Sequence, residues 1–200
     1  MVVALLLALP LGIWAAVRRG TWVDTLASAL ALIGLAMPMM LMAPLLLVWF
    51  FVELGWLPGP TEGGFAAVIL PAVAIGVHLM AMLARMTRAS MIDVLDEDYI
   101  RTARAKGLTE RAVLWRHALR NAMTPVITLG ALEFGTLLSG AVLTEQIFTI
   151  PGFGKLIVDS VFNRDYAVVQ GVVLVTATTY IVLNLLADVA YVLVNPRLRG

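Results

Sequence analysis

Long apolar runs, nearly free of charge, are the strongest constraint on how this chain can fold. Five such runs cover residues 1 to 17, 26 to 52, 65 to 84, 123 to 147 and 169 to 194. A helix needs about 20 apolar residues to cross a bilayer, so four runs are long enough and the first is short. With 61% hydrophobic residues and a mean hydropathy of +0.94, the composition argues against a soluble domain. We therefore predict an all-α membrane protein, a polytopic helical bundle with about five transmembrane helices.

The basic residues between these runs indicate the orientation. Most of them lie after the first run, between residues 85 and 120, and at the C-terminus; only Lys155 and Arg164 fall on the other side. The positive-inside rule then predicts a cytoplasmic C-terminus and places residues 53 to 64 and 148 to 168 outside. Because this topology begins outside, we expect that at least one N-terminal span is missing from the chain.

The sequence lacks the motifs of several enzyme classes. The chain has no cysteine, so disulfides, thiolate metal sites and cysteine nucleophiles are excluded. Neither a G-x-S-x-G nor an H-E-x-x-H motif occurs. The sequence "GFGKL" is similar to a phosphate-binding loop, but Thr149 and Leu156 stand where that motif requires Gly and Ser or Thr. We predict no enzyme activity, no metal site and no cofactor in this chain.

Polar residues inside the apolar runs are candidates for a pore. Glu133 lies within the fourth run, with His78 and Asn184 in the third and fifth runs as possible polar neighbours. Ionisable residues inside a membrane usually face a bundle interior or a water-filled cavity. A paired or protonated structural role for Glu133 remains open. Pro38 and Pro44 interrupt the second run and Pro71 the third, which is compatible with kinked helices around a path or with simple packing.

Residues 89–122, hereafter the charged segment, predict two polar helices joined by a turn. Gly107 is suited to end the first helix, and Thr109 to cap the second, with Glu110 in its first turn. On its residues alone, this segment could lie at the lipid surface or dock into a cytoplasmic protein. Its mixed charges argue against nucleic-acid binding, so we predict no nucleic-acid partner.

Several motifs resemble those of one family across the whole chain. They are "RRGTWVDTLASALALIGLAMP", "DYIRTARAKGL" followed by "RHALRNAMTPVIT", "TEQIFTIPGFGKLIVDSVFNRDYAVVQG" and "NPRLR". Together they resemble the inner-membrane permease subunits of binding-protein-dependent ABC importers, in the branch that transports dipeptides, oligopeptides and nickel. The general family signature in the charged segment is incomplete here, because its acidic residue, isoleucine and proline are replaced. The family carries about six spans, so the resemblance also implies that the first one is missing.

The resemblance implies a single permease domain, residues 1–200, that couples to a separate ATPase, which binds ATP. It assigns the coupling role to Arg101, Thr102, Ala103, Arg104, Lys106, Gly107, Leu108, Thr109 and Arg111. It further implies a second permease subunit and an external solute-binding protein, in a bacterial or archaeal cytoplasmic membrane. Residues 148–168, hereafter the PGFG segment, would form an external loop with a short helix. The implied external gate and binding-protein contacts are Glu145, Pro151, Gly152, Gly154 and Asp165.

One alternative function comes from another class. Glu133, His78 and Asp188 could form a proton relay in a secondary transporter or channel that works without an ATPase. Dependence on a partner ATPase distinguishes the two hypotheses. The sequence does not identify the transported solute.

Overall fold

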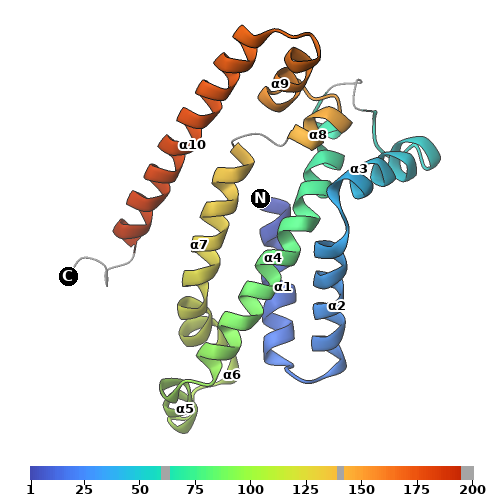
Figure 1. Ribbon diagram of the computed structural model, residues 1–200. Coiled ribbons are helices and arrows are strands. Elements are labelled where there is room, and N and C mark those ends of the chain that lie inside the picture. The colour runs from blue at the N-terminus through green and yellow to red at the C-terminus, as the bar shows by residue number, and fades with distance from the viewer. Residues whose placement is uncertain (60–63, 139–141, 195–200) are drawn as a thin grey trace. The chain divides into compact units, whose positions relative to one another are not determined.

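The computed structural model describes residues 1–59, 64–138 and 142–194, with the backbone alone at residues 138 and 187–194. Every regular element in these ranges is a helix (Figure 1). This agrees with the predicted all-α class. The residues form two compact units, Met1–Met37 with Gly76–Gly130, and Pro38–Ile75 with Ala131–Gly200. The C-terminal residues predicted to be cytoplasmic, 195–200, lie outside the described part.

The first unit is a helical bundle around the second part of α4. It contains α1 (Val2–Val17), α2 (Trp22–Ala36), α4 (Ile69–Leu95) from Gly76 onward, α5 (Asp98–Ala105), α6 (Glu110–Ala112), a π-helical stretch (Val113–Ala118) and α7 (Leu119–Leu138) through Gly130. Small residues allow the helices to approach closely. A Cβ at Gly12 of α1 would lie 2.7 Å from the Ala84 carbonyl oxygen of α4, and a Cβ at Gly34 of α2 would lie 3.3 Å from the Ala81 side chain.

The second unit contains shorter helices and the long C-terminal helix. Its elements are α3 (Met39–Leu47), a π-helical stretch (Val48–Glu53), a 3₁₀ turn (Phe65–Val68), the first residues of α4, the end of α7, α8 (Val142–Ile147), α9 (Phe153–Phe162) and α10 (Tyr166–Val194). Phe148 is 1% exposed and packs with Ala43, Leu70 and Ala74. Phe148 thereby joins the segment after α8 to α3 and the start of α4.

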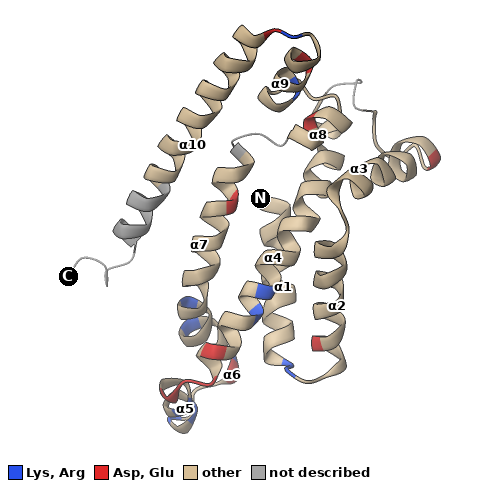
Figure 2. Cartoon of the chain, viewed as in Figure 1, with Lys and Arg blue, Asp and Glu red and all other residues tan. Residues whose placement is uncertain are grey.

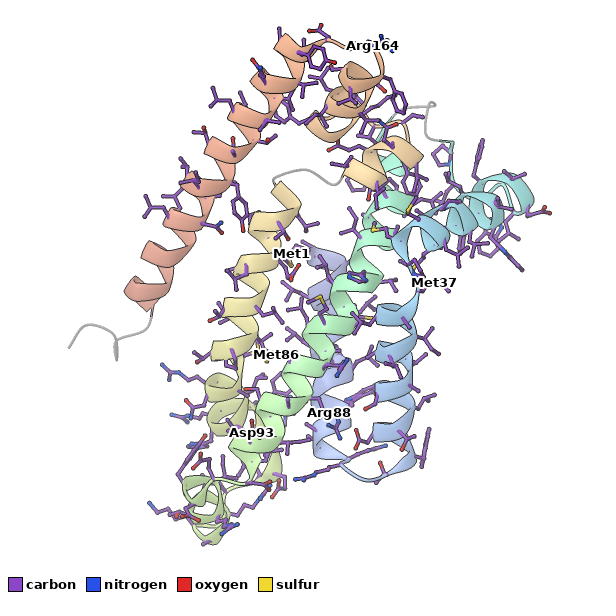
Figure 3. The ribbon with its side chains drawn as sticks, in the orientation of Figure 1. Met1, Met37, Met86, Arg88, Asp93 and Arg164 are labelled. Carbon is purple, nitrogen blue, oxygen red and sulfur yellow. The ribbon has the colours of Figure 1, made fainter. Side chains whose placement is uncertain are left out.

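Two helices in the described residues are long and apolar enough to cross a membrane, Phe65–Leu95 and Tyr166–Leu186. Helices α2 and α3 together qualify as a third span, but a 96° bend separates them. The predicted span 26–52 is therefore not one straight helix. α2 ends at Ala36, and Met37, labelled in Figure 3, and Pro38 both have extended backbone conformations. A proline cannot donate the helical hydrogen bond, which explains the break.

Two other predicted spans also differ from the helices that the structure shows. The span predicted over 123–147 corresponds to α7 and the separate helix α8, on either side of residues 139–141, which lie outside the described part. The predicted interruption at Pro71 is wrong. Pro71 is the third residue of α4, where a backbone N–H has no partner within the helix, so α4 continues unbroken to Leu95.

Candidate functional site

The charged segment folds as two helices joined by a tight turn at Gly107. α5 ends at Ala105, and Gly107 has φ +77°, a left-handed conformation that glycine adopts without steric cost. The Gly107 N–H donates to the Arg104 carbonyl at 2.9 Å. The Thr109 hydroxyl then accepts the Ala112 N–H at 3.4 Å and caps α6. The predicted glycine stop and threonine cap are both present.

An exposed ion pair spans this turn. Arg104 donates from Nε and Nη2 to the two carboxylate oxygens of Glu110, at 2.8 and 3.4 Å. Arg104, to which the resemblance assigns a coupling role, is thus paired with Glu110 of the same turn. Lys106 and Arg111 have no ion-pair partner among the described side chains. Exposed pairs contribute about 0 to 1 kcal/mol each, so the Arg104 pair positions the turn more than it stabilises the fold.

A buried cluster fixes the charged segment to the bundle. Its fully or nearly buried members are Ala16, Met91, Ile100, Ala103, Val113, Ala118 and Ala122. Two hydrogen bonds add to it: Ser90 Oγ donates to the Ala122 carbonyl at 2.8 Å, and Asn121 Nδ2 donates to Tyr99 Oη at 2.8 Å. Because the cluster joins α1, α4, α5 and the start of α7, the turn and these helices form one packed body in the first unit.

The predicted coupling residues divide by exposure. All of them except Ala103 are exposed, whereas Ala103 is 7% exposed and packs in the buried cluster. Beside them, Trp115 is 60% exposed. It lines a surface hollow of about 550 Å³ together with Thr109, Arg111 and Ala112. The surface around the turn therefore combines unpaired positive charge with a large exposed aromatic ring, a composition common in protein interfaces.

The PGFG segment is organised by the carboxylate of Glu145. This carboxylate accepts the Lys155 backbone N–H at 2.9 Å, in the first turn of α9, where a negative charge complements the helix dipole. A Cβ at Gly152 would overlap the Glu145 carboxylate, and a Cβ at Gly154 would lie 2.6 Å from the Val142 Cα. The two glycines are therefore needed for the close approach of α8 and α9.

Asp165 connects the PGFG segment to α10. Its Oδ1 accepts the N–H of Val168 in the first turn of α10 at 3.2 Å, and its own N–H donates to the Ser160 carbonyl at 2.8 Å. The preceding residue, Arg164, has φ +58°. Pro151 lies with Gly152 beside a second hollow of about 500 Å³. Each predicted gate residue thus lies at or beside the α8–α9–α10 connections.

The predicted pore residues fall in both units, His78 in the first and Glu133 and Asn184 in the second. Asn184 lies next to Gly135, where a Cβ would come 3.0 Å from Asn184 Oδ1. Glu133 accepts a hydrogen bond from the Thr136 hydroxyl at 3.4 Å, and its position on α7 is about 200° around the helix from Gly135. His78 belongs to the first unit, and its Nδ1 is buried without a hydrogen-bond partner among the described residues. The side chain of Asp188 lies outside the described part.

A partly buried ion pair that the sequence analysis missed joins α2 to α4. Arg88, labelled in Figure 3, donates to both carboxylate oxygens of Asp24, at 2.6 and 2.8 Å. Asp24 is 6% exposed, and it also accepts the Gly20 N–H at 3.0 Å. Such bidentate pairs fix the geometry of both partners. The only local signals were charges beside the apolar runs, Asp24 before one run and Arg85 and Arg88 after another, and they did not show which residues pair.

No group of three or more His, Asp or Glu side chains in the described residues is arranged to hold a metal ion.

Comparisons with known proteins place the chain in a family. Residues 8–200 match the family model described as the binding-protein-dependent transport system inner membrane component. The chain belongs to this family. Over 199 residues it is 46% identical to the glutathione transport system permease protein GsiC of Escherichia coli K12, and 45% identical to GsiC of Salmonella typhimurium. These alignments cover the whole chain but 65% of each relative.

A solved structure supports the fold of this inner membrane component. The crystal structure of an amino acid ABC transporter with histidines aligns with a TM-score of 0.56 and 16% identity, covering 94% of this chain and 87% of the other. At this identity the similarity concerns the fold alone. The family is one of membrane transport components, not of enzymes.

Proposed function

We propose that this chain is a permease subunit of an ATP-driven importer, in which it forms part of the translocation path and receives movement from a separate ATPase. The observation that carries the proposal is the exposed turn at Gly107, which the buried cluster joins to α1, α4 and α7. A partner that moves this turn must move those helices with it, because packed interiors transmit displacement as rigid bodies. Family membership supports the same role.

The coupling surface consists of the exposed predicted residues with Trp115. Lys106 and Arg111 supply positive charge for carboxylates of the ATPase, and Trp115 supplies a rigid aromatic anchor. Ala103 contributes indirectly, because it packs in the buried cluster that holds the turn in place. The charged segment lies in the cytoplasm in this arrangement, as does the C-terminus.

The PGFG segment lies on the opposite side of the membrane and contacts a solute-binding protein. Glu145, Gly152 and Gly154 hold α8 against α9. Pro151 lies just before α9, and Asp165 lies between α9 and α10. A second permease subunit completes the path. The names of the GsiC relatives favour a peptide as the solute, since glutathione is itself a tripeptide. Nickel, the other solute of the predicted branch, has no ligand cluster among the described residues.

The test is copurification of the ATPase with Gly107→Asp and Trp115→Ala variants of the assembled importer. Aspartate at φ +77° strains the turn and adds a negative charge where we expect carboxylates to approach. We expect both variants to insert into the membrane, to copurify with less ATPase than the wild type, and to show reduced ATP-dependent uptake. Normal copurification of both variants would contradict the docking assignment. Uptake by the wild-type protein driven by an ion gradient without ATP would favour the secondary transporter instead.

A further inference from the structure

Three sides of α4 in the first unit are covered by neighbouring helices. Ala84 and Thr87 face Gly12 of α1, and Val77 and Ala81 face Gly34 of α2. On the side of α7, the Ser90 hydroxyl bonds to the Ala122 carbonyl. These contacts settle the packing of this part of α4 and leave one strip of the helix surface uncovered.

The uncovered strip carries His78, Met82, Arg85 and Ala89. Their spacing of four, three and four residues places them on one face of the helix. Arg85 and Ala89 are exposed, while His78 and Met82 are half-buried. In Figure 2, basic residues appear within α4 itself, in the same unbroken helix as the apolar residues that qualify as a membrane span.

Arg85 differs from Arg88, one turn further along α4. Arg88 is neutralised by the bidentate contact with Asp24, whereas Arg85 has neither an ion pair nor a side-chain hydrogen bond among the described residues. An unpaired guanidinium has five donors in a planar fork that matches a carboxylate. The structure therefore presents one free anion-binding group in this part of α4.

His78 argues against a lipid-facing strip. It lies seven residues before Arg85, about 10 Å further along the same face. If the strip faced hydrocarbon, the half-exposed imidazole would be a polar group in lipid, in addition to the buried Nδ1 that already lacks a partner. A water-filled path satisfies both residues, and the small side chain of Ala89 leaves space beside Arg85.

We propose that the strip His78–Met82–Arg85–Ala89 lines the solute path and that Arg85 binds the carboxylate of the transported solute. This rests on the proposed permease function and narrows the substrate class to solutes with a free carboxylate, such as short peptides. An extended peptide of three residues spans about 10 Å, which matches the distance from Arg85 to His78 along the helix.

Cysteine labelling tests the environment of the strip, and the chain has no native cysteine to interfere. Met82→Cys and Ala89→Cys are introduced separately into the assembled importer and treated with negatively or positively charged methanethiosulfonate reagents. We expect both positions to react, and to react several-fold faster with the negative reagent. Arg85→Gln should abolish that preference. Leu174→Cys, on the exposed apolar surface of α10, is the control, because we expect that surface to face lipid rather than water. Lack of reaction at both strip positions, or a charge preference that persists in Arg85→Gln, would overturn the proposal.

Uptake into proteoliposomes tests the carboxylate contact. With trialanine as the probe, we expect Arg85→Gln to reduce uptake roughly tenfold and Arg85→Lys to recover part of it, while ATP hydrolysis stimulated by the loaded binding protein remains. Arg18→Gln, another exposed arginine without a described ion pair, should have no effect. Normal uptake by Arg85→Gln refutes the site but leaves the permease function intact. Absence of ATP-dependent uptake by the wild-type importer with any peptide or nickel refutes the function itself. A defect seen only with anionic lipids would assign Arg85 to a lipid headgroup and overturn the proposal.

Discussion

The contact of Glu145 with Gly152 and Gly154, at the start of α9, allows a prediction in which one substitution is rescued and its neighbour is not. Gly152 has φ −148°, an extended conformation that alanine adopts equally well. The cost of Gly152→Ala therefore comes only from the overlap of its Cβ with the Glu145 carboxylate. A Cβ at Gly154 meets the Glu145 carboxylate at 2.9 Å but also meets the backbone Cα of Val142 at 2.6 Å. A side chain can be removed by mutation, but a backbone atom cannot.

The magnitudes follow from these contacts. Overpacking of this kind costs about 1 to 3 kcal/mol, so we expect Gly152→Ala and Gly154→Ala each to destabilise within that range. Glu145→Ala removes the carboxylate that accepts the Lys155 N–H, a loss of about 1 kcal/mol. In the Glu145→Ala background, the cost of Gly152→Ala should fall to near zero, whereas Gly154→Ala should keep most of its cost. Such coupling is the signature of two groups in direct contact.

The assay is equilibrium unfolding of the purified permease in mixed detergent micelles with increasing sodium dodecyl sulfate, followed by circular dichroism. The wild type, the two single variants and the double variant of Glu145 and Gly152 form one cycle, and the corresponding four proteins for Glu145 and Gly154 form a second. Equal cost of Gly152→Ala with and without Glu145 would refute the proposed contact. Complete rescue of Gly154→Ala by Glu145→Ala would show that the α8 backbone is not the obstacle.

Three further predictions concern the first unit and the coupling surface. Asp24→Asn should destabilise the permease by about 2 kcal/mol in the same unfolding assay, because Arg88 loses its charged partner, and Arg88→Met in addition should restore part of the loss. Gly12→Ala should cost about 1 to 3 kcal/mol, because its Cβ would lie 2.6 Å from the Thr87 Cβ; Gly171→Ala on α10, with no atom within 4 Å, should not destabilise. Trp115→Ala should leave unfolding within about 0.5 kcal/mol of the wild type and weaken ATPase binding roughly tenfold in a titration with purified ATPase.

Features that depend on neighbours in the chain could be predicted from the sequence. The apolar runs predict helices because about 20 uncharged residues in a row have no other stable arrangement in a bilayer. The turn of the charged segment was predictable for a similar reason. Gly107 permits a positive φ, and Thr109 supplies a capping oxygen to an N–H three residues away. The resemblance to known permeases, rather than local chemistry, selected Glu145, Gly152, Gly154 and Asp165.

The positions where helices break were harder to predict than which segments are helical. The sequence marked Pro38 and Pro71 alike as interruptions, yet only the break at Pro38 separates two helices. The difference is register: Pro71 lies in the first turn of its helix, and the position where a helix begins depends on what its preceding residues pack against. In unit two, Leu70 and Ala74 pack with Phe148, so a distant residue helps to place that end of α4.

The sequence by itself determined which segments are helical, where the charged turn lies and which family the motifs resemble. Only the tertiary structure decided which side of each helix is covered: that Asp24 neutralises Arg88, that Ala103 is core rather than surface, and that Asn184 lies against Gly135. The physical reason is that hydropathy and turn formation act over a few residues, whereas pairing and burial depend on side chains that are far apart in the sequence, 64 positions in the Arg88–Asp24 pair.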